Sequence, residues 1–82
     1  MPESFEEQAE AIWNHLRTIL LAANMDLQNL VLLRTYLADA KFDEANARLR
    51  TKYLGTHRPA LTVCCRLLEP EWLAEMEAMA AQ

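Results

Sequence analysis

Hydrophobic residues recur at two different spacings along this chain, and each spacing predicts a different kind of element. The first set recurs at helical spacing and comprises Ile12, Leu16, Ile19, Leu20 and Ala23. It predicts an amphipathic helix over residues 5–23. Ser4 and Glu7 support the start of this helix as a capping box, in which a hydroxyl and a carboxylate satisfy free backbone amides.

Residues 29–37, NLVLLRTYL, are too short and too apolar for a surface helix, and they predict a strand. Alternation would place Leu30, Leu32, Arg34 and Tyr36 on one face and Val31, Leu33, Thr35 and Leu37 on the other. A strand that is apolar on both faces is typical of the middle of a sheet.

A second helix is predicted over residues 41–54. Its apolar positions follow helical spacing and are Phe42, Ala45, Leu49 and Tyr53. Asp39 is a suitable N-cap residue for this helix. Gly55 occupies the position of a left-handed C-cap residue, and Pro59 follows beyond it.

Two late segments complete the pattern. Residues 60–68 read as a strand between Pro59 and Pro70. Residues 72–80 leave two interpretations open, because their Ala, Glu, Met and Leu content favours a helix. Alternation instead favours a strand, with Trp72, Ala74, Met76 and Ala78 on one face and Glu75 and Glu77 on the other. From composition alone, the helix is the better interpretation.

Composition narrows the class of protein. With 82 residues and 52% hydrophobic content, the chain reads as one small domain over residues 1–82 that buries its remaining apolar surface in a homo-oligomer. A net charge of −4 argues against nucleic acid as the main partner. The sequence has neither a signal-peptide pattern nor the ~20 consecutive apolar residues that span a bilayer. We therefore expect a cytoplasmic protein without a membrane partner.

Cys64 and Cys65 are the first candidate for chemistry. Adjacent side chains on a strand point to opposite faces, so the two thiols cannot hold one metal together. His15 and His57 lie in other elements, and no zinc-ligand spacing is present. We interpret both cysteines as structural and predict no metal site. Because Gly55 is the only glycine, a glycine-rich phosphate loop is excluded.

Charged residues offer three further candidates. On a strand, Glu75 and Glu77 would share a face about 6.5–7 Å apart and could orient a water or exchange protons. Arg58, in the turn after the second helix, suits either the helix dipole or a substrate carboxylate. A basic group comprising Arg34, Arg48, Arg50 and Lys52 reads as a solvated face.

Several local strings, in order, resemble the Rid/YjgF family of reactive-intermediate deaminases. Residues 22–39, AANMDLQNLVLLRTYLAD, resemble the family's helix end, turn and central strand, and Phe42 and Asn46 match its next helix. Residues 57–63, HRPALTV, resemble its RPAR corner, and residues 75–80, EMEAMA, resemble its terminal strand.

The resemblance implies an α/β (α+β) fold of the YjgF type, similar to chorismate mutase. A mixed sheet is backed by two helices in the order α-β-α-β-β, and residues 72–80 form a strand. It also implies a homotrimer with clefts between subunits. Active members hydrolyse imine and enamine intermediates to ammonia and a keto acid without metal or organic cofactor.

Carried over residue by residue, the resemblance makes Glu77 the glutamate that orients the attacking water, and Asn46 the helix asparagine. The family's carboxylate-binding arginine falls on Leu61, and Arg58 stands three residues earlier. The family's opening strands have no counterpart, so we expect either a shortened member or a fragment of one, whose sheet edge is covered by association.

Two functions remain open. The preferred interpretation is a small-molecule-binding protein whose site, lacking the arginine at Leu61, takes a small carboxylate or a more apolar metabolite. The alternative is an imine or enamine deaminase that uses Glu77. RNA cleavage, an activity sometimes attached to the family, fits least, because the chain has a net charge of −4.

Overall fold

A sheet with its longest strand in the middle organises the fold of this chain. The structure is a computed structural model that describes residues 4–57, 60–64, 67 and 71–81. Its elements are α1 (Phe5–Ala22), β1 (Leu30–Leu37), α2 (Asp43–Leu54), β2 (Ala60–Cys64) and β3 (Ala74–Ala80), with short 3-10 turns η1 (Leu27–Asn29) and η2 (Ala40–Phe42). The predicted α+β class is confirmed, and so is the strand interpretation of the tail.

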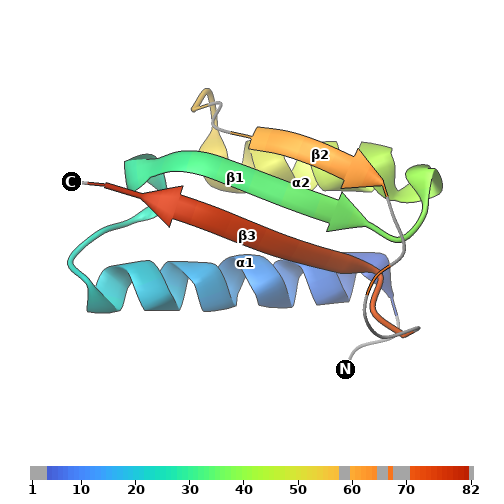
Figure 1. Ribbon diagram of the computed structural model, residues 1–82, viewed down its shortest axis with the longest axis horizontal. Helices are drawn as coiled ribbons and strands as arrows, with labels where there is room; N and C mark the ends of the chain where they lie inside the picture. Colours follow the sequence, from blue (N-terminus) through green and yellow to red (C-terminus); the bar gives the residue numbers. More distant parts are fainter. Residues whose placement is uncertain (1–3, 58–59, 65–66, 68–70, 82) are drawn as a thin grey trace.

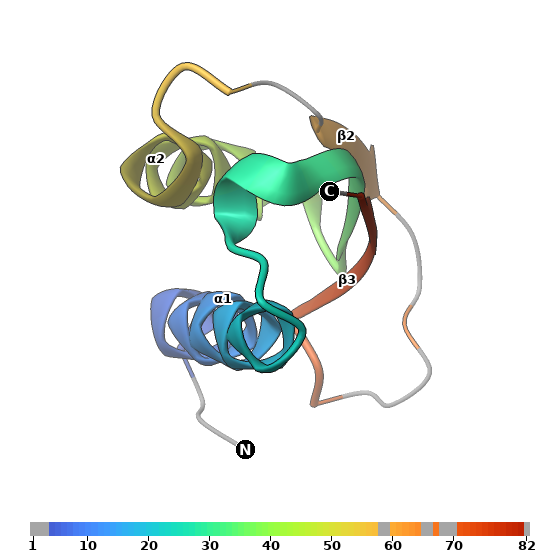
Figure 2. The ribbon, with the colours of Figure 1, turned by 90° about the vertical axis from the view of Figure 1, so that its left-hand side faces the viewer.

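The three strands lie in the order β2-β1-β3, which confirms the central position predicted for β1. β1 is parallel to β2 and antiparallel to β3, so the sheet is mixed. α1 and α2 both lie against one face of this sheet (Figures 1 and 2). The chain therefore covers one face of its sheet with helices, and we call the other face the open face.

The start of β1 departs from the predicted alternation. A register shift between Leu30 and Leu32 leaves Val31 as an extra residue in the ladder to β3. Leu30 and Leu33 are consequently both buried on the helix side, with 1% and 0% exposure, whereas Val31 is 60% exposed. Assigning Leu30 to the face of Arg34 was therefore wrong, because a bulge resets which residues face each way.

The core lies between the helices and the sheet. Trp13 of α1 is fully buried and stacks on Tyr53 of α2, with ring centroids 5.1 Å apart. The other buried apolar residues of the core are Phe5, Ala9, Leu20, Leu27, Leu30, Leu33, Leu37, Leu49, Leu54 and Ala74. Both predicted helices face this core, but the stripe predicted for α1 does so only in part. Ile12, Leu16 and Leu20 pack in it, whereas Ile19 is 55% exposed and Ala23 is exposed.

Local caps set the ends of the helices. The amide of Glu7 donates to Ser4 Oγ over 3.1 Å, as the capping box predicts. Asp39 accepts a hydrogen bond from the amide of Lys41 and caps η2 rather than α2, so α2 itself begins two residues later than predicted. Gly55 ends α2 with a φ of +61°, a backbone conformation that favours glycine.

Gln8 ties the first helix to the start of the last strand. Its side chain is 2% exposed. Gln8 Nε2 donates to the carbonyl of Glu71 over 3.1 Å, and Gln8 Oε1 accepts from the amide of Leu73 over 2.8 Å. A buried amide that is satisfied on both sides fixes where β3 begins, and hence which residues of β3 reach the open face.

Candidate functional site on the open sheet face

Three cross-strand pairs form the part of the open face that lies on β1 and β3. The register pairs Leu32 with Met79, Arg34 with Glu77, and Tyr36 with Glu75. All six side chains alternate with residues that pack toward the helices, such as Leu33, Thr35 and Leu37. One face of the sheet therefore passes from an apolar pair to an ion pair and then to a tyrosine–glutamate pair.

Arg34, Tyr36 and Glu77 form a hydrogen-bonded cluster in the middle of this face. Arg34 Nη1 forms an ion pair with Glu77 Oε1, and the hydroxyl of Tyr36 donates to the same oxygen over 2.8 Å. Arg34 Nη1 also donates to the Tyr36 hydroxyl over 3.4 Å. The hydrogen bond to Tyr36, together with the charges of Tyr36 and Glu77, raises the pKa of Arg34 above its ordinary value.

Two donors therefore hold one oxygen of Glu77, and this leaves the other oxygen available. Glu77 Oε2 has no hydrogen-bond partner among the residues that the structure describes. The Glu77 side chain is 52% exposed, so this oxygen can meet solvent or a ligand. Such a carboxylate is positioned to accept a hydrogen bond from a water in a fixed direction.

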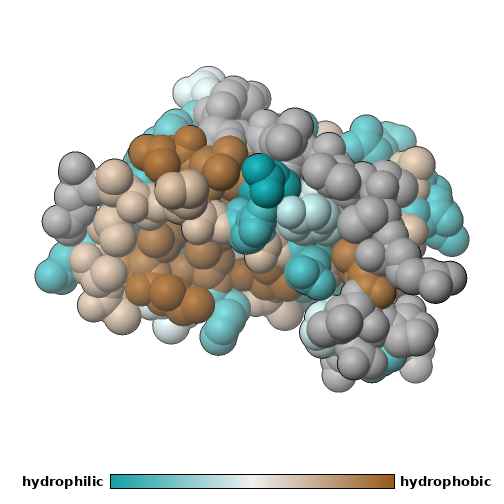
Figure 3. Space-filling model, in the orientation of Figure 1, coloured by the Kyte–Doolittle hydropathy of each residue, from teal (hydrophilic) through white to brown (hydrophobic). Residues whose placement is uncertain are grey.

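A hollow of about 280 Å³ lies directly beside the cluster. It is lined by Leu32, Arg34, Glu77, Ala78 and Met79. Apolar side chains gather in this view over the half of the molecule that holds the start of β1 and the end of β3 (Figure 3). The hollow therefore joins charged groups at one end to apolar groups at the other, as sites for small metabolites often do.

The residues that the sequence predicted for the site end up in different places. Glu77 lies on the open face. Leu61 stands opposite Arg34 in the register of β2. Asn46 is 2% exposed on α2, so it lies in the helix layer and not with Glu77. Arg58 falls outside the described residues, and so does Cys65.

Arg34 is the residue that the sequence interpretation misassigned. It was grouped with Arg48 and Lys52 as a solvated basic region, but those two residues lie on α2 and pair with acids of α1, Glu6 and Glu10. Arg34 instead pairs with Glu77 on the opposite side of the sheet. Alternation along β1 already separated Arg34 from the helix layer, so that signal was present in the sequence.

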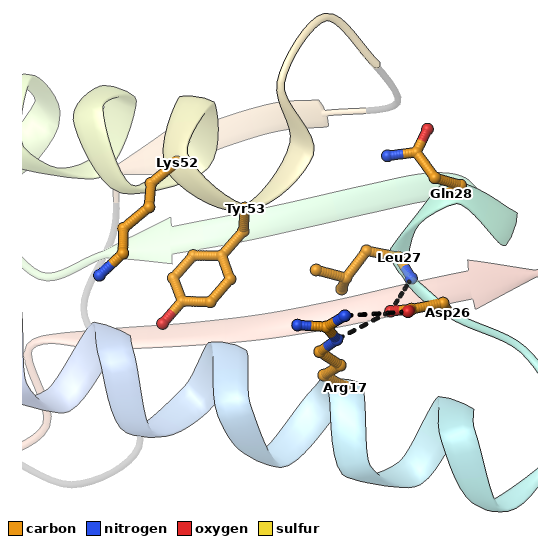
Figure 4. Close-up of a pocket in the computed structure, with 6 residues that line it drawn as sticks. All are labelled: Arg17, Asp26, Leu27, Gln28, Lys52 and Tyr53. Carbon is orange, nitrogen blue, oxygen red and sulfur yellow. Dashed lines mark hydrogen bonds and ion pairs between the residues drawn. The ribbon is translucent and has the colours of Figure 1, made fainter.

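A second hollow, of about 370 Å³, lies between the two helices and η1 (Figure 4). Arg17 holds Asp26 through two hydrogen bonds of 3.0 and 3.1 Å. Lys52 Nζ and the hydroxyl of Tyr53 both contact Glu10, at 2.7 and 3.0 Å. Each cation here already has an acidic partner, so these contacts act as a clamp between elements.

Neither a metal-binding cluster of side chains nor a membrane-spanning helix occurs in the part of the chain that the structure describes. No group of three or more His, Cys, Asp or Glu side chains lies close enough together, within those residues, to hold a metal ion. None of the helices that the structure describes is both long enough and apolar enough to cross a bilayer.

Comparison with known proteins gives a consistent family. Residues 1–82 match the family model described as Endoribonuclease L-PSP. The yeast (Saccharomyces cerevisiae) protein HMF1 is 33% identical over 81 residues, which cover 96% of this chain and 62% of HMF1. The mitochondrial yeast protein MMF1 is 38% identical over 58 residues, covering 70% of this chain and 39% of MMF1. The chain thus spans less than two thirds of the length of these relatives.

Solved structures show the same fold. The yeast protein YEO7 superposes with a TM-score of 0.90 and 29% identity, covering all of this chain and 66% of YEO7. YyfA from Yersinia pestis, a Rid-family protein of unknown function, superposes with a TM-score of 0.91 over all of this chain and 67% of YyfA. At 20% identity, the likeness to YyfA concerns the fold alone.

Proposed function

Since the chain belongs to the Endoribonuclease L-PSP family, the family of the Rid and YjgF proteins, we propose that it binds a small metabolite on the open face of its sheet. The observation that carries this proposal is the Arg34–Tyr36–Glu77 cluster beside the hollow lined by Leu32 and Met79. Charged groups fix the orientation of a ligand there, and apolar groups contact the rest of it.

A second copy of the chain completes the site in this proposal. Val31 and Met79 are 60% and 61% exposed, and Met79 lines the hollow itself. Large exposed apolar side chains at one end of a sheet favour an interface. We propose a homotrimer, as the family resemblance implies, with the open face of one subunit turned toward its neighbour. A cytoplasmic location is part of the same proposal.

A second candidate function is hydrolysis of an imine or enamine derived from an amino acid. It is favoured by the way Glu77 is held, with Oε1 fixed by two donors and Oε2 available for a water. Water would add to the imine carbon while Glu77 accepts one of its protons and passes it to the nitrogen, which gives a carbinolamine. The hydroxyl proton of the carbinolamine would then pass through Glu77 to the nitrogen as the C–N bond breaks, so that ammonia leaves and the carbonyl group forms. The products are ammonia and a 2-oxo acid.

The name of the family raises RNA cleavage as a third function, and the charges of this chain support it less. Of the eight Lys and Arg residues in the sequence, Arg17, Arg34, Arg48 and Lys52 are already paired with carboxylates. Proteins that bind nucleic acid present unpaired basic residues to the phosphates.

Two measurements test these proposals. Isothermal titration with 2-oxobutanoate should give saturable binding to the full chain, and no heat at millimolar ligand would contradict small-molecule binding. For hydrolysis, ammonia release would be followed from an imino acid generated by an amino acid oxidase. Glu77→Gln should reduce the rate of ammonia release to the rate without added protein. Glu75→Gln changes an acid two residues away on the same face, and its rate of ammonia release should stay near that of the unchanged protein.

A further inference from the structure

The guanidinium of Arg34 has an unused edge. Only Nη1 takes part in the contacts to Glu77 and Tyr36. Nε and Nη2 have no partner among the residues that the structure describes. These two atoms carry parallel N–H bonds that match the two oxygens of a carboxylate. The side chain of Arg34 is 37% exposed, so a ligand can reach this edge.

The position of Arg34 within the sheet gives this edge a defined place. Arg34 lies on the central strand, between Leu61 of β2 on one side and Glu77 of β3 on the other. Neighbouring strands lie about 4.8 Å apart, so these three residues form one row across the sheet. Arg34 therefore contributes a cation next to the carboxylate of Glu77 and beside position 61.

We propose that Arg34 is the carboxylate anchor of this site and makes it prefer ligands that carry a carboxylate over their neutral isosteres. This inference rests on the proposed function, because it names the ligand class of the same hollow. Nη1 keeps Glu77 in place while Nε and Nη2 bind the ligand carboxylate. The tail of the ligand contacts Leu32 and Met79.

The same arrangement explains why one guanidinium is enough for two carboxylates. Arginine has five N–H donors in a fixed plane, and the Nη1 side and the Nε–Nη2 side point in different directions. The ligand carboxylate and Glu77 then sit on different sides of one cation. A lysine would offer a single charged point, so Arg34→Lys should not reproduce the bidentate contact.

The test compares a carboxylate with its neutral isostere on the same protein. Binding of 2-oxobutanoate and 2-oxobutanamide would be measured by titration calorimetry for the unchanged chain, Arg34→Gln, Arg34→Lys and the control Arg48→Gln. The unchanged chain and the control should prefer the acid. Arg34→Gln should weaken acid binding about tenfold or more, the size expected for losing a charge-assisted contact, and leave amide binding nearly unchanged.

The outcomes separate this inference from the proposed function. If the unchanged chain binds neither compound, the proposed function fails. If it binds the acid and Arg34→Gln binds the acid equally well, the function stands and the role of Arg34 is overturned. Should Arg34→Gln lose its fold because Glu77 is left unpaired, the double variant Arg34→Gln/Glu77→Gln keeps a neutral pair. It should then bind the acid no better than the amide, and a retained preference for the acid would overturn the inference.

Discussion

Arg34 on β1 and Glu77 on β3 are ion-paired across one rung of the sheet, although 43 residues separate them in the chain. Both side chains are substantially exposed, at 37% and 52%. Exposed ion pairs contribute about 0–1 kcal/mol to stability, because water screens the charges and two long side chains lose freedom. The pair is therefore better explained by what it positions on the open face than by what it adds to the fold.

Gln8 is expected to matter more for stability than any of the exposed ion pairs. Gln8→Leu takes away the hydrogen-bond partner of the Glu71 carbonyl and that of the Leu73 amide, and both bonds are part-buried. Leaving a buried polar group unpaired costs about 1–3 kcal/mol, so the free energy of unfolding should fall by about 1–3 kcal/mol in all. Urea denaturation followed by circular dichroism measures the change. Gln28→Leu, at an exposed position, is the matched control, and an equal loss in both variants would contradict the role of Gln8.

The Arg17–Asp26 pair predicts a specific change in a pKa. The hydrogen bond from Arg17, followed by that from the amide of Leu27, lowers the pKa of Asp26. Arg17→Gln should therefore raise the pKa of Asp26 toward the ordinary aspartate value of about 3.9. Carbon-detected NMR titration of the Asp26 carboxyl measures this shift. An unchanged pKa in Arg17→Gln would show that the guanidinium does not interact with Asp26 in solution, and Arg48→Gln serves as the control.

The same pair sets the direction of a pH effect on stability. The pKa of Asp26 is depressed in the folded state, so its contribution to stability is present above the unfolded pKa. It is lost as the pH falls through the folded pKa. Arg17→Gln should consequently be less stable than the unchanged protein above about pH 5, and the stabilities of the two proteins should converge as the pH falls through the folded pKa of Asp26. Urea denaturation at a series of pH values measures this difference, and a gap that persists unchanged in acid would contradict the role of the pair.

Met79 tests whether the open face is an interface between copies of the chain. Met79→Glu places a charge on a side chain that is 61% exposed at the apolar end of this face. If a second copy covers this end, burying that charge is costly, and the assembly should dissociate. Sedimentation velocity measures the mass. Ile19→Glu, at a 55% exposed position on α1, should leave the mass unchanged, and an equally stable assembly in Met79→Glu would contradict the interface.

Much of the fold could be predicted from the sequence, because long periodic segments report directly on burial. Ile12 and Leu16 marked α1, and Phe42 and Tyr53 marked the second helix, since these residues pack on the core that the periodicity implied. Composition misled at residues 72–80, where alanine, glutamate and methionine favour a helix. Pairing with β1 determines the strand there, and that pairing is a long-range property which no local propensity contains.

The site was less predictable, for a related reason. Glu77 was identified through a family resemblance and lies on the open face. Arg34 and Tyr36 were missed as its partners, because the register of β1 with β3 decides which residues meet. The bulge at Val31 also moved Leu30 off the face that simple alternation assigned to it. Asn46 matched a family position but is buried in the helix layer, where a sequence match alone does not show which way the side chain points.

We propose above that a small carboxylate binds on the open face at Arg34 and Glu77. Its most direct test is a titration of 2-oxobutanoate into isotope-labelled full chain, followed by NMR. If the ligand binds there, the signals of the Arg34 Nε–H and of the amides of residues 32–36 and 75–79 should shift together and saturate, while those of Arg17 and Lys52 in the hollow between the helices should not. Shifts confined to Arg17 and Lys52, or no saturable shift on β1 and β3, would contradict it.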